Sequence, residues 1–183
     1  MEETLGRVKY RIVNPAFFLK YAYPCIEFWY KNEKLARELE KPWADEFYKI
    51  ISPTLLKKLR LIAQGKEKLN SKIERKLEKL VPFAFYFLKK LGKKDKGEVV
   101  IDEEIIRNYF LSLHEKVLGM RKKKYKKIFE LCKIKEGMIV ELRKKYAKVK
   151  IGKKYREVRL DFIDNPKVGD RVRIHFFYAC EKI

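Results

Sequence analysis

The sequence predicts an α+β fold, in which an N-terminal all-α helical domain over residues 1–127 precedes a small C-terminal β-barrel over residues 128–183. Two observations indicate this division. Apolar side chains recur at helical spacing through most of the first region. The second region consists of short alternating segments separated by glycine, asparagine and proline. With 183 residues, 46% of them hydrophobic, the chain is long enough for both regions to bury apolar cores.

The first forty residues combine a short extended segment with an aromatic cluster. β-Branched residues and a tyrosine lie among Lys and Arg over residues 7–13, and Asn14-Pro15 ends this segment. The aromatic residues that follow are Phe17, Phe18, Tyr21, Tyr23, Phe28, Trp29 and Tyr30. Such rings can stack on single-stranded bases, but their helical spacing favours the core of the helical domain. A charged helix over residues 33–40 is predicted to end before Pro42.

Further helices are predicted between residues 52 and 120. Ser52-Pro53 combines a hydroxyl N-cap with proline at the first helical position. Apolar stripes continue over residues 69–80 and 83–91, interrupted by Pro82, and residues 92–97 are predicted to form an exposed loop. Asp102 is expected to cap a long helix. His114 lies on that helix with no second ligand at metal spacing, which is typical of a structural or solvated histidine.

The chain is strongly basic, with 46 Lys and Arg against 25 Asp and Glu and a formal net charge of +21. A charge of this size attracts polyanions. The best nucleic-acid candidate is the run Arg121, Lys122, Lys123, Lys124, Tyr125, Lys126 and Lys127. Alternatively, this basic run is the solvated end of a helix. No helix-turn-helix, zinc-finger, P-loop or dinucleotide-binding motif accompanies the run.

Four strands are predicted in the C-terminal region, over residues 137–142, 146–151, 155–160 and 171–177. Gly152-Lys153-Lys154 is predicted to form a hairpin turn, and further breaks fall at residues 165–166 and 169–170. About fifty residues of short strands and turns fit a small closed or nearly closed barrel.

Cysteine usage and the absence of targeting segments indicate a cytoplasmic protein with reduced thiols. The three cysteines, Cys25, Cys132 and Cys180, are too few and too widely spaced for a disulfide framework or a CxxC zinc site. The N-terminus lacks the apolar stretch of a signal peptide. The longest apolar run, residues 81–88, is far shorter than the roughly 20 residues that span a bilayer. The charged composition, 39%, also suits a thermophile.

The C-terminal region resembles the HypC/HupF family of hydrogenase maturation chaperones over about 53 residues. The family's opening motif, Met-Cys-Leu-Ala-Ile-Pro-Gly-like, is matched by Leu131-Cys132, Gly137 and Val140-Glu141. The strand before its last loop is matched by residues 156–161. Its closing signature, Val-Gly-Asp-x-Val-x-Val-His-like, is matched by Val168-Gly169-Asp170, Val172, Ile174-His175, Tyr178-Ala179 and Lys182-Ile183.

This resemblance implies a HypC-like, OB-like barrel that acts as an accessory in nickel–iron hydrogenase assembly. Its partner would be a HypD-like protein or the hydrogenase large subunit. By residue-to-residue transfer, Cys132 would bind iron transiently through its thiolate, with His175 beside it, and no cofactor would be tightly bound. A soft thiolate suits low-valent iron, and a nearby imidazole helps to keep the thiol deprotonated.

Two other functions stay open from the sequence. The chain is either a basic, two-domain RNA- or DNA-binding protein that has reused the small barrel, or an interaction scaffold without a ligand. We expect no enzymatic activity and no catalytic residues, because no acid–base pair or activated nucleophile is visible beyond Cys132 and His175.

Overall fold

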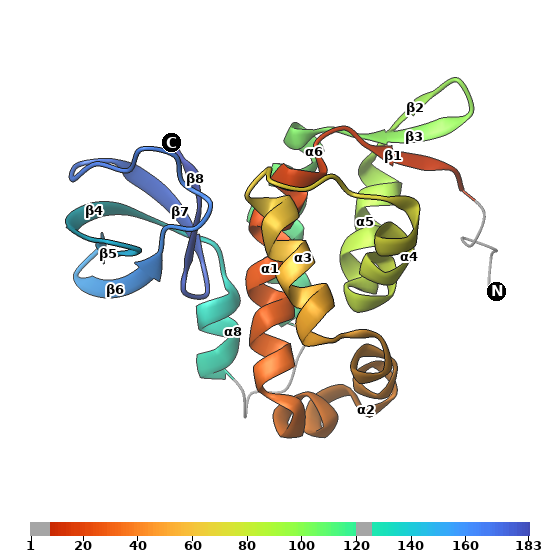
Figure 1. Cartoon of the computed structure of the whole chain (residues 1–183), viewed down its shortest axis with the longest axis horizontal. Helices are drawn as coiled ribbons and strands as arrows, with labels where there is room; N and C mark the ends of the chain where they lie inside the picture. The colour runs from red at the N-terminus through yellow and green to blue at the C-terminus, as the bar shows by residue number, and fades with distance from the viewer. Residues whose placement is uncertain (1–7, 120–125) are drawn as a thin grey trace.

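The structure, a computed structural model, describes residues 8–119 and 126–183, and it combines a helical N-terminal part with a C-terminal β-barrel (Figure 1). The helices are α1 (Pro15–Lys31), α2 (Glu33–Ile50), α3 (Pro53–Ala63), α4 (Ser71–Leu80), α5 (Pro82–Leu91), α6 (Glu103–Asn108), α7 (His114–Gly119) and α8 (Lys126–Cys132), with a π-helical turn (Tyr109–Leu113) between α6 and α7. The strands are β1 (Tyr10–Ile12), β2 (Lys93–Asp95), β3 (Glu98–Ile101), β4 (Lys135–Arg143), β5 (Tyr146–Ile151), β6 (Lys154–Arg159), β7 (Arg171–His175) and β8 (Tyr178–Lys182).

The helix starts follow from capping residues. The Ser52 hydroxyl accepts a hydrogen bond from the Leu55 amide at 3.1 Å, and the Asp102 carboxylate accepts one from the Ile105 amide at 3.0 Å, as predicted. The helix end expected before Pro42 is confirmed as a break within α2, where two helical stretches meet at a kink. Glu40 leaves the helical region (φ −146°, ψ 68°), and the chain then continues as helix to the end of α2.

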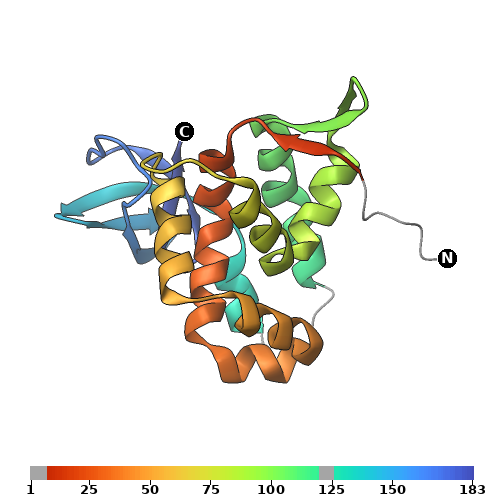
Figure 2. The same ribbon diagram turned by 45° about the vertical axis from the view of Figure 1, so that its right-hand side comes forward.

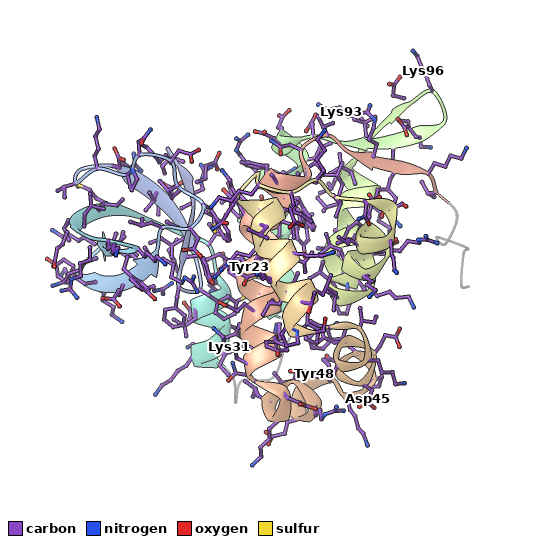
Figure 3. The ribbon with its side chains drawn as sticks, viewed as in Figure 1. Tyr23, Lys31, Asp45, Tyr48, Lys93 and Lys96 are labelled. Carbon is purple, nitrogen blue, oxygen red and sulfur yellow. The ribbon has the colours of Figure 1, made fainter. Side chains whose placement is uncertain are left out.

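Helix α1 lies between the barrel and helices α4 and α5 (Figure 1, Figure 2). Its aromatic residues face inward: Phe18, Tyr21 and Tyr23 are buried, and Figure 3 labels Tyr23 in the middle of the helix. The interpretation of this cluster as core is therefore confirmed. Phe162, Tyr178 and Cys180 of the C-terminal part belong to the same apolar cluster. The barrel is thus joined to the helices by a continuous core.

The N-terminal part is not all-α, because it contains a three-stranded sheet in the order β1-β3-β2. β1 pairs in parallel with β3, matching Tyr10 with Val99, and β2 pairs with β3 in an antiparallel hairpin. Residues 92–97, predicted as a loop, therefore include a strand. Lys96 (φ 44°) and Gly97 (φ 83°) form the hairpin turn, and Lys96 lies at its tip (Figure 3). The β-branched run before Asp102 supplies the partner for the extended segment near the N-terminus.

The C-terminal strands close into a barrel in the order β4-β5-β6-β8-β7. The contact between β6 and β8 is parallel, and the other strand pairs are antiparallel. Fully buried aliphatic side chains fill the interior; they are Ile139, Ala147, Val149, Val158, Val172, Ile174 and Ala179. The predicted strand over residues 171–177 ends at His175. A two-residue turn, Phe176-Phe177, then leads into β8, a strand that was not predicted separately.

Over the described ranges, no helix has the length and apolar character that crossing a membrane requires.

Candidate metal centre

Two cysteines and two histidines meet where the barrel packs against the helices. Cys25 lies in α1, His114 begins α7, Cys132 ends α8 and His175 ends β7. One ligand atom from each of these four side chains lies within 4.8 Å of the other three. The four residues come from four separate elements, so this site exists only when the helical part and the barrel are assembled together.

The interatomic distances fit a tetrahedral metal site. The Cys25 and Cys132 sulfurs are 3.4 Å apart, and each lies 3.3 Å from Nε2 of His175. Nε2 of His114 is 3.7 Å from the Cys132 sulfur. A tetrahedral zinc ion would hold two sulfurs about 3.8 Å apart, and a sulfur and a nitrogen about 3.6 Å apart. In these four pairs the donors differ from tetrahedral spacing by only a few tenths of an ångström, and all four ligand atoms lie within 4.8 Å of one another.

A backbone carbonyl of α1 fixes the orientation of His175. Nδ1 of His175 lies 2.6 Å from the carbonyl oxygen of Tyr21. A carbonyl can only accept a hydrogen bond, so Nδ1 must carry the proton, and the lone pair of the neutral ring is then on Nε2. That nitrogen faces the two sulfurs. Metal-binding histidines are commonly oriented in this way by a carbonyl or carboxylate on their second nitrogen.

The π-helical turn sets the position of His114. The His114 amide bonds to the carbonyl of Tyr109, five residues earlier, instead of four. One extra residue in a turn shifts the facing of the helix that follows by about 100° relative to a continuous α-helix. The His114 ring consequently packs beside Phe110, with 5.4 Å between ring centroids, and 5.2 Å from His175.

The turn between β7 and β8 holds the barrel side of the site against the helices. Phe176 is buried, has a positive φ of 51° and stacks on Phe28 of α1 with 4.5 Å between ring centroids. Its amide donates to the carbonyl of Leu131 at 3.0 Å. The residues adjoining both Cys132 and His175 are thereby tied to each other and to α1.

The centre is buried and favours thiolate at Cys25. Cys132 is 3% exposed, His114 8% and His175 0%, while Cys25 is half-buried. Burial acts to raise the pKa of the Cys25 thiol, but the hydrogen bond with Cys132 and the neighbouring imidazoles outweigh burial and hold this pKa well below its usual value. Thiolate is the form that binds metal.

Sequence reasoning named two of the four residues, Cys132 and His175, and the structure places them 3.3 Å apart. It missed Cys25 and set His114 aside as a lone histidine. The third cysteine, Cys180, stays out of the cluster: its sulfur lies 3.7 Å from the Tyr178 carbonyl, and burial raises its pKa.

The basic run over residues 121–127 is described in part. Residues 121–125 lie outside the described ranges, and Lys126 and Lys127 are exposed at the start of α8.

The four side chains could therefore hold a metal ion. Neither a scan against protein-family models nor a search of curated proteins gave a match to this chain.

Proposed function

We propose that this is a metal-binding protein in which Cys25, His114, Cys132 and His175 hold one zinc ion that fastens the barrel to the helices. The observation that carries the proposal is the convergence of two sulfur and two nitrogen donors within 4.8 Å. Two thiolates and two neutral imidazoles form one of the standard ligand sets of structural zinc, and tetrahedral S₂N₂ geometry favours zinc over magnesium or calcium.

The burial of the centre supports a structural role for the ion. Four protein ligands complete a tetrahedral shell, whereas catalytic zinc sites keep one position for water or substrate. The ligands span residues 25 to 175 of the chain, a separation of 150 residues (175 − 25 = 150). Because such distant segments form the site only in the folded protein, metal binding would stabilise the assembled state.

A HypC-like accessory role is the second candidate, in which iron would be cargo. The closeness of Cys132 and His175, at 3.3 Å, and their place beside a five-stranded barrel favour it. The strand order β4-β5-β6-β8-β7 is also compatible with an OB-like barrel. Transfer of iron to a partner requires an accessible thiolate, however, and the burial of Cys132 favours a resident ion.

Metal analysis of the full-length protein tests these proposals. We expect about one zinc per chain after purification from medium containing both zinc and iron, retained on dialysis. Cobalt substitution should give the visible absorption of a tetrahedral thiolate-bound ion. Cys25→Ala should lose the metal, whereas the matched control Cys180→Ala should keep it. A metal-free protein that binds no added zinc contradicts the zinc proposal. Iron as the bound metal, released to a HypD-like protein, favours the second candidate.

A further inference from the structure

The outward face of β5 and β6, with Phe177 of the turn before β8, forms a surface that contains none of the four proposed metal ligands. The strand register places Tyr146 opposite Arg159 and Lys150 opposite Tyr155. The alternate residues Ala147, Val149 and Val158 are buried in the barrel core, so these pairs face outward. Tyr146 and Tyr155 are therefore separated by about four residues along the strands, or about 14 Å.

Three aromatic rings are exposed on this surface. Tyr146 is 42% exposed, Tyr155 57% and Phe177 47%, whereas Phe176, next to Phe177 in the same turn, is 1% exposed. The turn thus directs one ring into the protein and presents the other to solvent. Tyr146 and Phe177 line a groove of about 570 Å³ at the junction with α1. Its charged lining residues are Lys31, labelled in Figure 3, and Arg159, together with Glu27 and Glu157.

The same surface carries a large positive charge. Residues 141–159 contain nine Lys and Arg against two Glu. The acids, Glu141 and Glu157, both pair with Arg143. The exposed lysines that make no ion pair within the described part of the chain are Lys144, Lys145, Lys148, Lys150, Lys153 and Lys154. The ammonium group of Lys148 lies 4.9 Å from the centre of the Tyr155 ring.

We propose that this β5–β6 face binds single-stranded nucleic acid, with bases stacking on Tyr146, Tyr155 and Phe177 and with the lysines contacting phosphates. Exposed rings interleaved with unpaired cations are the features that bind single strands with little sequence preference. The corresponding strands and loops of small five-stranded barrels are used for oligonucleotides. A duplex offers no free base faces, so a single strand should bind more tightly. This surface is distinct from the basic run over residues 121–127 and does not depend on the metal proposal.

Fluorescence anisotropy of the full-length protein tests the proposal, with labelled oligothymidine and oligouridine of about 15 nucleotides and a duplex of equal length as probes. The logarithm of the binding constant should fall with the logarithm of salt concentration, with a slope of about −0.7 per phosphate neutralised. Each of Tyr146→Ala, Tyr155→Ala and Phe177→Ala should weaken single-strand binding at least about fivefold, the lower end of the stacking range. The control Tyr86→Ala, another exposed tyrosine, should not.

A second pair of variants separates this face from general attraction to a basic protein. Lys148→Gln with Lys150→Gln should make the salt slope shallower by about 1.4, the value for two lost phosphate contacts. Lys68→Gln with Lys72→Gln removes the same charge near the start of α4, across the helical part from the barrel (Figure 1), and should leave the slope unchanged. Absence of single-strand binding, equal binding of the duplex, or equal effects of face and control variants would overturn the proposal.

Discussion

Removal of the bound metal is expected to lower the free energy of unfolding by about 4 kcal/mol. A ligand that binds the folded state alone contributes about 4.1 kcal/mol at a thousandfold excess over its dissociation constant. The four ligands belong to segments separated by 89, 18 and 43 residues (114 − 25, 132 − 114 and 175 − 132), so the unfolded chain cannot preform the site. For a chain of this length, about 4 kcal/mol corresponds to a decrease in melting temperature of about 8 to 16 °C.

Thermal unfolding followed by circular dichroism measures this change, with the protein loaded with zinc and after treatment with a chelator. The zinc-dependent rise in melting temperature should nearly vanish in Cys25→Ala, which has three of the four ligands. It should persist in Cys180→Ala, which removes a buried sulfur outside the cluster. The reasoning is refuted if the wild-type protein shows no zinc-dependent rise, or if both variants lose that rise equally.

Three further predictions concern the core around the site. Because their sulfurs are 3.4 Å apart, mild oxidation of the metal-free protein should link Cys25 to Cys132, as peptide mass spectrometry would detect, and bound zinc should prevent it. Burial acts to raise the pKa of Glu181, but three hydrogen-bond donors hold this pKa below its usual 4.5. The free energy of unfolding should therefore fall as the pH drops through the lowered pKa. In denaturant titrations, Glu181→Gln should flatten this pH dependence and lower the free energy of unfolding by about 1 to 3 kcal/mol at neutral pH. Phe176→Ala should lower the free energy of unfolding by about 3 to 5 kcal/mol in the same assay, through loss of its stacking on Phe28.

Local chemistry explains which parts of the fold were predictable from sequence. Proline, hydroxyl and carboxylate caps act within one helical turn, so the starts at Ser52 and Asp102 could be located. Alternating apolar residues likewise revealed most of the barrel strands. The sheet formed by β1, β2 and β3 escaped prediction because it pairs residues about 90 apart in the chain, such as Tyr10 and Val99, and two of its strands have only three residues.

Only half of the candidate site could be predicted from the sequence, because local motifs do not show which distant residues meet in space. Cys132 and His175 lie close to or within the barrel, where a motif indicated both. Cys25 lies among the core aromatics of α1, and Pro24-Cys25 gives no local sign of a ligand. His114 looked isolated because its neighbours in space are not its neighbours in sequence, and because a π-helical turn, which is invisible in apolar periodicity, determines its facing.

Because the barrel and the helices share a continuous core, we expect the proposed metal to add stability to a protein that folds without it. Small zinc domains derive about 10 to 16 kcal/mol, their whole folding free energy, from the ion. Here Tyr178 of the barrel packs edge-on against Tyr23 of α1 with 5.7 Å between ring centroids, and Phe176 stacks on Phe28, independently of any metal. These contacts hold the barrel to α1 through side chains that are not among the four proposed ligands. The proposed ion would then fix the junction of α1, α7, α8 and β7, so its removal is expected to cost a few kcal/mol and not to cause complete unfolding.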